Sequence, residues 1–392
     1  MQAIRQLYRI GYGPSSSHTI APYRIASYYR REFPDCDEYE IILGGSLALT
    51  ASGHGSIGII KRALDCDKVE FRYDLSTKKN IMNICGRKKG KKMPTWHGVS
   101  LGGGAIEIKE YDAGDLDDIY DENSFEEIKK YLNENGCSLI EYVYSHEENL
   151  KDYLKECLQT MYQVVEKGLG SEGLLNEELN YHRIAKKLYE KAKTDKDYLT
   201  AYSYATCEEN AAGGMMCTAP TLGACGIMGS LMYFLHKNKN VDDDVLCDML
   251  AIGGVFGNCI KKNASIAGST GGCQAEVGTA CAMASAAIAY YDGYGLDTIE
   301  YAAEMGIEHF LGLTCDPVLG YVIIPCIERN AISILRAYDC AYLAESFKDI
   351  KKNAISFDSV VSAMNYTGNK LARELKETSL GGLSLEYKNE KS

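Results

Sequence analysis

Long hydrophobic runs are missing from this sequence of 392 residues. A membrane-spanning helix needs about 18 consecutive apolar residues, whereas the best candidates, residues 249–260 and 280–291, span 12 each. The N-terminal segment lacks the apolar core and small-residue cleavage site of a secretory signal. We therefore expect a cytoplasmic protein that does not contact a membrane.

Positive charge is also scarce. Lysine and arginine total 42 against 54 acidic residues, which gives a formal net charge of -12. Nucleic acids and anionic membranes are bound through concentrated basic surfaces. The one basic run, residues 87–92 (RKKGKK), is short and contains a glycine, a pattern typical of an exposed hairpin tip. We expect no nucleic-acid partner.

Cysteine, in contrast, is abundant, with 15 residues. In a long chain without an export signal, reduced thiols are expected rather than disulfides. Cys217, Cys225, Cys259 and Cys281 lie among alanine, glycine and methionine and are interpreted as small buried hydrophobic residues. A minority of the thiols is left to bind metal.

The pattern of hydrophobic residues changes once along the chain. Short β-like runs at 41–43, 69–73 and 105–108 alternate with helical stretches near 21–33 and 57–64. From residue 124 onward the periodicity is helical, at 125–133, 148–167, 176–193, 226–237, 243–258, 278–291, 327–344 and 359–377. We predict an α+β N-terminal domain (1–112), an acidic linker (113–123) and a larger all-α domain (124–392).

Hydroxyl residues cluster immediately before the first expected helix, in residues 13–19 (GPSSSHT). Hydroxyl groups and free helix N–H groups bind carboxylates, so this segment suits the acidic end of an amino acid. A helix cap with a surface histidine has the same pattern. Spacing alone leaves both interpretations open.

A second histidine, His54, follows the segment 45–53 (GSLALTASG) at an expected strand-to-helix turn. Imidazole titrates near neutral pH and is the usual proton-transfer group of enzymes. The chain has only seven histidines, and two on glycine- and serine-rich turns of one small domain can form one wall of a site. The structural alternative is a hydrogen-bonded loop histidine.

The segment 207–214 (CEENAAGG), which leads into 218–223 (TAPTLG), places polar side chains between glycines. This favours a loop whose backbone N–H groups face an anion, although a structural helix–loop–helix also fits.

Three further cysteines each lie on a turn. Cys273 ends a glycine- and serine-rich loop where a helix is expected to begin, and Cys315 and Cys326 each have a proline within two residues. A helix N-terminus favours the thiolate that a metal requires. Their separations of 42 and 11 residues match no common zinc or ferredoxin spacing, so three buried thiols remain the alternative.

Taken together, these segments resemble the iron–sulfur-dependent L-serine dehydratases, also called L-serine ammonia-lyases. The shared motifs are GPSSSHT (13–19), GSLALTASGH (45–54), SLGGG (100–104), EENAAGG (208–214), TAPTLGACG (218–226), KNASIAGSTGGCQAEVG (262–278), EHFLGLTCDPV (308–318), PCIERN (325–330) and TSLGGL (378–383). They occur in the family's order and extend over nearly the whole chain.

The resemblance implies a β-type domain fused to an all-α catalytic domain, and conversion of L-serine to pyruvate and ammonia in amino-acid degradation and gluconeogenesis. It implies a 4Fe–4S cluster on Cys273, Cys315 and Cys326, with one iron left free as a Lewis acid. His54 is then the base for the α-proton, assisted by His18. The substrate-binding residues would be Ser15, Ser16, Ser17, Thr19, Thr218, Asn263 and Ser265. We also expect a homodimer.

The chain departs from the family in two places. Some members close the open iron with a C-terminal cysteine, whereas the last cysteine here is Cys340, so we expect no such capping. Many members carry His-Pro-Asn-x-Met in the first domain, where this chain has Lys78-Lys79-Asn80-Ile81-Met82. The choice of substrate is therefore less constrained than the cofactor.

Three other functions are compatible with parts of the pattern. A related lyase would act on L-cysteine or another small β-substituted amino acid. A pyridoxal-phosphate dehydratase would use the Gly102-Gly103-Gly104 loop for phosphate, but no lysine stands in a Schiff-base context and the three cysteines would be unexplained. An amino-acid-binding regulatory module would bind serine without releasing pyruvate.

Overall fold

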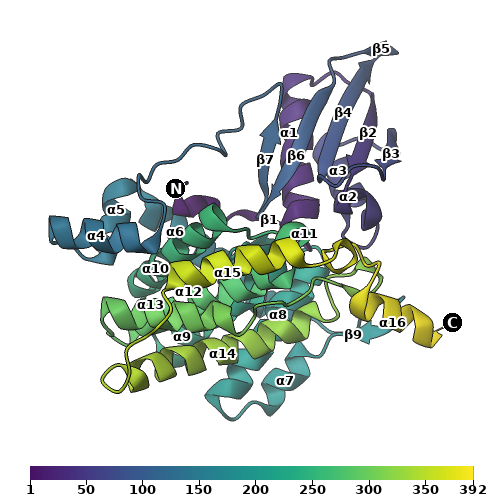
Figure 1. Cartoon of the computed structure of the whole chain (residues 1–392). Helices are drawn as coiled ribbons and strands as arrows, with labels where there is room; N and C mark the ends of the chain where they lie inside the picture. The colour runs from purple at the N-terminus through teal and green to yellow at the C-terminus, as the bar shows by residue number, and fades with distance from the viewer. Residues whose placement is uncertain (392) are drawn as a thin grey trace.

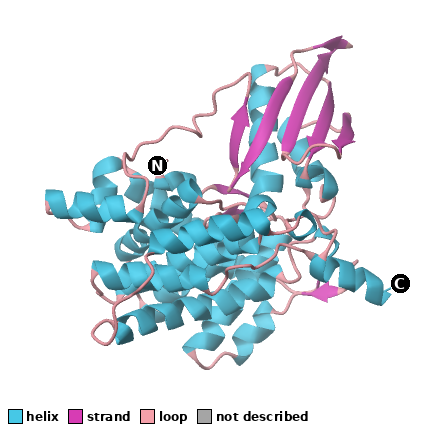
Figure 2. Ribbon diagram, viewed as in Figure 1, coloured by secondary structure: helices cyan, strands magenta, loops and turns pink. Residues whose placement is uncertain are grey.

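A mixed β-sheet stands at one end of the molecule and a large helical assembly forms the rest (Figure 1; Figure 2). This computed structural model describes residues 1–391. The α+β domain followed by an all-α domain, predicted from the sequence, is confirmed. Among the described residues, no helix has the length and apolarity required to cross a membrane.

The sheet of the small domain has the strand order β3-β2-β4-β6-β7, with β5 paired to β4. Its strands are β2 (Glu38–Gly44), β3 (Val69–Asp74), β4 (Ile81–Lys88), β5 (Lys91–Lys92), β6 (Trp96–Gly102) and β7 (Ala105–Ile108). Strands β2 and β3 run parallel and the other pairs are antiparallel. Alternate residues of β2, namely Tyr39, Ile41 and Leu43, enter the core, where helices α1 (Ala21–Glu32) and α3 (Ser56–Leu64) cover the sheet.

The three predicted strands are present, but the sequence did not indicate β4 and β6. The basic run is the β4–β5 hairpin tip, as expected, and its turn residues Lys89 and Gly90 both have positive φ (49° and 77°).

The helical domain contains α4 (Phe125–Asn135), α5 (Leu139–His146), α6 (Leu150–Gly170), α7 (Ala185–Lys191), α8 (Asp195–Ala211), α9 (Cys225–Lys239), α10 (Asp243–Asn263), α11 (Gly268–Gly271), α12 (Val277–Tyr291), α13 (Leu296–Glu308), α14 (Cys326–Phe347), α15 (Phe357–Lys370) and α16 (Gly382–Lys391). Helix α12, rich in alanine, is the central one, since nearly every one of its residues is buried. Its small side chains let neighbours approach closely: a Cβ on Gly306 of α13 would lie 2.8 Å from Ala282 Cα.

Two predicted helices are partly wrong. Residues 176–182 belong to a short hairpin, β8 (Leu174–Asn176) and β9 (Tyr181–His182), because the Asn176 side chain accepts a hydrogen bond from Leu179 N and Asn180 is left-handed. The last predicted helix ends at Lys370 rather than at residue 377. The segment that follows pairs through its backbone with Cys315, and this contact, distant in sequence, overrides local helix propensity.

The N-terminal segment does not begin in the small domain. Ile4, Leu7 and Tyr8 are part of the helical core, and Tyr8 Oη donates to Leu250 O at 2.7 Å. Strand β1 (Ile10–Tyr12) then pairs with β10 (Met215–Cys217) of the helical domain. The chain therefore leaves the helical domain, builds the small domain and returns.

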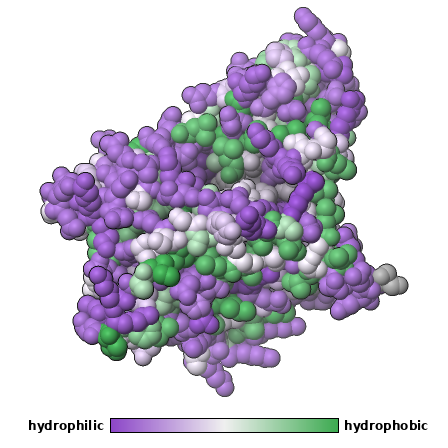
Figure 3. Space-filling view, in the orientation of Figure 1, coloured by the Kyte–Doolittle hydropathy of each residue, from purple (hydrophilic) through white to green (hydrophobic). Residues whose placement is uncertain are grey.

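The return passes through the acidic segment that the sequence marks as a linker, visible in Figure 1 as a long loop between β7 and α4. It is anchored by the buried Asp115, which accepts hydrogen bonds from Arg24 Nη2 at 2.9 Å and from Ile106 N at 2.9 Å. Burial opposes ionisation, but contact with Arg24 and Arg9 lowers the pKa of Asp115. The face shown in Figure 3 is mostly hydrophilic, with apolar patches scattered over it.

Candidate active site

Two buried histidines of the small domain face each other where it meets the helical domain. His18 lies in the helical turn Ser16–Ile20 that leads into α1, and His54 lies between α2 (Ser46–Leu49) and α3. Their ring centroids are 4.3 Å apart, and their exposed fractions are 0% and 1%. The loop of His54 sits tightly on the helical domain, because a Cβ on Gly53 would be 2.6 Å from Gly320 O. We call this pair the imidazole wall.

A carboxylate that was not predicted from the sequence lies between the two rings. Glu377 Oε1 lies 3.6 Å from His18 Nδ1 and 3.6 Å from His54 Nε2, and the side chain is buried. Although burial opposes ionisation, the two imidazoles lower the pKa of Glu377. The only sequence signal is its position immediately before the TSLGGL motif.

Hydroxyl groups fix the ring of His18. Ser15 Oγ lies 3.0 Å from its Nδ1 and Ser46 Oγ lies 3.1 Å from its Nε2. Burial lowers the pKa of His18 to about 4, against the opposing effect of Glu377. His18 is therefore a neutral imidazole at pH 7, with one nitrogen donating and the other accepting.

Two polar atoms of this cluster lack partners. His54 Nδ1 and Glu377 Oε2 are buried and have no hydrogen-bond partner among residues 1–391. Both side chains line one cavity, together with Ser15. Buried polar atoms are normally satisfied, so these two mark a place for a ligand.

The three candidate cysteines also line this cavity, and we call them the thiol wall. Cys273 begins a short helical turn (Cys273–Ala275) after Gly272, whose φ is 77°. Cys315 follows α13, and its N–H donates to Leu375 O at 2.8 Å. Cys326 is the first residue of α14. The fold thus brings together thiols separated by 42 and 11 residues.

The surroundings of the thiols fit a bound cation. Burial raises the pKa of Cys273 to about 11, although Arg329 beside it acts in the opposite direction. Burial also raises the pKa values of Cys315 and Cys326. Thiolates at such a site require a positive charge, which a bound metal supplies. Three soft sulfur donors that line one cavity fit iron–sulfur or zinc chemistry better than a hard oxygen-binding ion.

A second carboxyl group lies against the thiol wall. Glu276, just before α12, accepts a hydrogen bond from Thr221 Oγ1 at 2.8 Å. Burial, reinforced by the charge of Glu377, raises the pKa of Glu276 to about 8. Space is tight: a Cβ on Gly268 would lie 2.6 Å from Glu276 Oε2 and 3.0 Å from Cys315 Sγ. Glycine at position 268 keeps this side of the cavity open.

Several predicted substrate-binding residues do not reach the cavity. Thr218 Oγ1 donates to Leu7 O at the domain junction, and Thr19 Oγ1 donates to Tyr12 O. Asn263 Nδ2 binds Asn123 O at 2.6 Å, because Asn263 is the last residue of α10 and faces the connecting segment. The hydroxyl oxygen of Ser265 accepts from Ala267 N at 3.0 Å.

Ser16 and Ser17 are buried in the turn before α1, and of the described cavity-lining residues only Ser15 comes from this serine run. Of the seven residues predicted to bind the substrate, Ser15 lines this cavity, and a role for the other six stays a prediction.

The segment 207–214, predicted to be an anion-binding loop, is mostly helical. Its first five residues are the last turns of α8, where Glu208 accepts from Ile184 N at 2.7 Å and Glu209 pairs with Lys167. The acidic side chains are satisfied inside the helical domain. Asn210 has an interdomain role, since its Nδ2 donates to Pro14 O at 2.8 Å.

Asn80, in the segment Lys78–Met82, links the two domains. Its Oδ1 accepts from Ser46 N at 2.8 Å and from Ser46 Oγ at 2.9 Å, and its Nδ2 donates to Ser269 Oγ at 3.1 Å. Because Ser46 in turn contacts His18, Asn80 positions the imidazole wall against the helical domain. In the sequence, this segment differs from the family pattern by its lysine, and the interdomain contact of Asn80 has no local signal.

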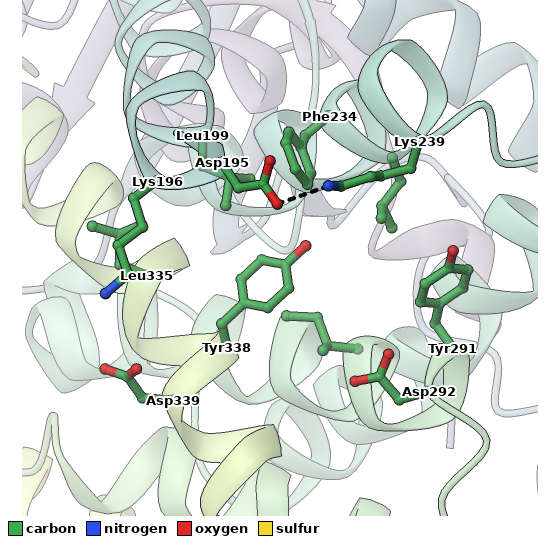
Figure 4. Close-up of a pocket in the computed structure, with 12 residues that line it drawn as sticks. Asp195, Lys196, Leu199, Phe234, Lys239, Tyr291, Asp292, Leu335, Tyr338 and Asp339 are labelled. Carbon is green, nitrogen blue, oxygen red and sulfur yellow. Dashed lines mark hydrogen bonds and ion pairs between the residues drawn. The ribbon is translucent and has the colours of Figure 1, made fainter. Parts of the chain in front are cut away.

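His18, His54 and Glu377 are a second possible set of metal ligands, since one ligand atom from each lies within 4.8 Å of the others. Another cavity, of about 300 Å³, lies at the C-terminal end of α12, ~20 Å along the helix from Glu276. Figure 4 shows Tyr338 pointing into it and the Asp195–Lys239 ion pair at its edge. Its described lining contains neither histidine nor cysteine, so the reactive groups gather between the imidazole and thiol walls.

Comparison with known proteins gives consistent matches over the chain. Residues 77–384 match the family model described as serine dehydratase alpha chain, and residues 3–101 match the one described as serine dehydratase beta chain. L-serine dehydratase 2 of Escherichia coli (strain K12) is 32% identical over 451 aligned positions, covering 98% of this chain and 99% of that protein. L-serine dehydratase of Streptomyces coelicolor is 31% identical, covering 98% of each chain.

Proposed function

Because the chain belongs to the serine dehydratase family, with its alpha and beta parts in one polypeptide, we propose that it converts L-serine to pyruvate and ammonia. The observation that carries this proposal is the single cavity that is lined both by His54 of the imidazole wall and by the three cysteines of the thiol wall. One wall offers a proton acceptor and the other offers metal ligands. Eliminating water from serine needs both, because the α-proton is weakly acidic and hydroxide is a poor leaving group.

We assign Cys273, Cys315 and Cys326 as the ligands of a 4Fe–4S cluster. When bound, a cluster held by three thiolates supplies one open iron, a Lewis acid for the substrate's oxygens. The support is the donor set itself, three buried thiols on a common cavity with Arg329 beside Cys273.

His54 is assigned as the general base. Its Nε2 lies 3.6 Å from Glu377 Oε1, so we place the ring N–H on Nε2, and the unpartnered Nδ1 is left to accept the α-proton. Glu377 and His54 thus resemble a carboxylate–histidine pair, in which the carboxylate selects the tautomer and stabilises the imidazolium that forms. Glu377 acts here as a positioning residue.

Ser15, which lines the cavity, is assigned to holding the substrate, and His18 is assigned to positioning Ser15. His18 Nδ1 lies 3.0 Å from Ser15 Oγ, and Ser46 Oγ holds the other ring nitrogen. Burial of both side chains keeps bulk water away from the base.

The atoms of the reaction balance without a further reactant. His54 takes the α-proton, the Cα–Cβ double bond forms, and the Cβ–O bond breaks with hydroxide leaving. The resulting aminoacrylate rearranges to an imine, which water hydrolyses to pyruvate and ammonia.

We further propose that the protein works in the cytoplasm as a homodimer. All 15 cysteines are unpaired, which suits a reducing compartment. Light scattering of the purified protein would measure the oligomeric state; a mass of one chain, 43.2 kDa, would contradict the dimer.

The test of function is pyruvate release by anaerobically reconstituted protein. L-serine and L-cysteine are supplied separately, and iron and acid-labile sulfide are counted in the same sample. We expect pyruvate from serine with about four irons and four sulfides per chain. About one metal ion per chain without sulfide would instead favour a mononuclear site on His18, His54 and Glu377.

A lyase acting on L-cysteine remains the second candidate, because a thiol substrate can occupy the same cavity. Turnover of cysteine but not of serine by cluster-loaded protein would keep the cofactor and change the substrate. Serine binding without pyruvate release would indicate a regulatory module.

A further inference from the structure

A separate cavity of about 320 Å³ lies at the domain interface, beside the candidate active site. The small domain contributes Gly45, Ser46, Leu49 and Lys78, and the helical domain contributes Ser269, Asn369, Leu371, Arg373, Lys376 and Thr378. Its volume is at the lower end of the ~300–1,000 Å³ typical of small-molecule sites, which often lie between domains.

The charge of this lining has one sign. Lys78, Arg373 and Lys376 are its charged residues, and no carboxylate is among the described residues around the cavity. None of the three cations forms an ion pair with any group in residues 1–391. Such a cluster is unusual in a chain with a net charge of -12, where Lys129, for comparison, contacts both Asp297 and Glu300.

Uncharged groups of the lining complete a set of donors. The Ser269 hydroxyl accepts a hydrogen bond from Asn80, which leaves its own proton free to be donated. Two acids are adjacent to these cations in sequence: Glu377 contacts His18 and His54 on the catalytic side, and Glu374 is exposed and is not part of the lining. The cavity therefore presents positive charge and a free O–H to whatever enters it.

From this arrangement we infer that the cavity binds a phosphate-type oxyanion that bridges the two domains. Lys78 reaches the ligand from the small domain, and Arg373 and Lys376 reach it from the helical domain. Arginine and lysine bind phosphate through charge-assisted hydrogen bonds. A zwitterionic amino acid is disfavoured because its ammonium group would face three cations without a carboxylate partner, so this site is distinct from the one for serine.

The site is positioned to influence the imidazole wall. Ser46 lines the oxyanion cavity and also contacts His18, and Thr378 lines it and directly follows Glu377. A ligand that contacts both Lys78 and Arg373 would hold the small domain against the loop that carries Glu377 and Thr378. Binding of the anion does not depend on the reaction we propose.

The test is calorimetric titration of the full-length, cluster-loaded protein with inorganic phosphate and, separately, with glycerol 3-phosphate. Lys78→Glu is the main variant because Lys78 is exposed, and Arg373→Glu probes the other domain. Matched controls are Lys79→Glu, the next exposed residue in the same loop, and Lys370→Glu at the end of α15; neither lines the cavity. Melting temperatures report whether each variant is folded.

We expect both probes to bind to the wild type and to both controls, and the dissociation constant to rise at least ~10-fold in Lys78→Glu. Tighter binding of glycerol 3-phosphate than of phosphate would identify a phosphorylated metabolite as the ligand; the reverse would identify free phosphate.

Three results would overturn the inference. The first is absence of binding to the wild type by either probe. The second is equal affinity in Lys78→Glu and Lys79→Glu. The third is strict competition between phosphate and L-serine, which would place the anion in the catalytic cavity.

Discussion

The two walls of the catalytic cavity are built in different ways. The thiol wall comes from helix starts and turns of the helical domain, where Cys273 and Cys326 each begin a helical segment. The imidazole wall comes from loops of the small domain and depends on hydroxyl groups and Asn80 to hold it. Cofactor binding and proton transfer are therefore separable by mutation, and the following experiments test this separation.

The largest effect is expected from the thiol wall. Cys315→Ala removes one of the three proposed cluster ligands, so we expect loss of the bound iron and sulfide and no detectable pyruvate release. Visible absorbance and iron analysis after anaerobic reconstitution measure the first effect. Cys340→Ala, which changes a buried cysteine of the same domain, is the control and should retain the cluster. A Cys315→Ala protein with full iron content would remove Cys315 from the ligand set.

The imidazole wall should show the opposite pattern. His54→Ala removes the proposed base, so kcat should fall at least ~100-fold while iron and sulfide content stay unchanged. His97→Ala, at an exposed histidine of the same domain, should leave kcat unchanged. Near-normal turnover in His54→Ala with its cluster intact would show that another group removes the proton.

The buried ring of His18 makes stability depend on pH. Its pKa in the folded state, about 4, lies below the 6.5 of an exposed histidine, so folding favours the neutral ring. This stabilisation is complete above pH 6.5 and is lost as pH falls toward 4. The loss at pH 5, relative to neutral pH, is roughly 2 kcal/mol. The difference in melting temperature between wild type and His18→Gln should therefore be smaller at pH 5 than at pH 7.5. An equal drop in both proteins would contradict this assignment.

Removing the charge that links the walls should have a smaller effect. Glu377→Gln keeps the size of the side chain but loses the carboxylate that orients His54, so we expect kcat to fall about 10-fold with little change in KM. The kcat–pH profile should shift as well, because the imidazolium loses its counter-charge. Glu374→Gln, at an exposed residue of the same loop, is the control. An unchanged pH profile would assign Glu377 a purely structural role.

The smallest effect is expected at a residue that the sequence placed at the substrate. Asn263→Ala removes a hydrogen bond to the connecting segment, which should cost about 1 kcal/mol of stability. Because Asn263 does not reach the cavity, kcat should change less than ~2-fold. A large loss of kcat at normal stability would return Asn263 to the substrate site.

The features that could be predicted from the sequence are those with a local pattern of residue types. The order of domains follows from the change of periodicity, and His18, His54 and the three cysteines stand on glycine-, serine- or proline-rich turns. Glu377 could not be located in this way, because the sequence predicts a helix through this position. In the structure the helix ends at Lys370, and the following segment pairs with Cys315, 62 residues away from Glu377 in sequence. Thr218 and Asn263 lie inside shared motifs, yet their side chains bind backbone oxygens, a use that residue type does not reveal.

The path of the N-terminal segment determines what would hold the two domains together if they were separate chains. Ile4, Leu7 and Tyr8 are anchored in the helical core, and β1 is a strand of the helical domain's small sheet. If the covalent connection between β7 and α4 were cut, the fragment bearing the sheet would keep this apolar anchor and its strand pairing. One polypeptide or two subunits encoded separately would then assemble the same enzyme, and gene fission or fusion at this loop would be nearly neutral for the fold.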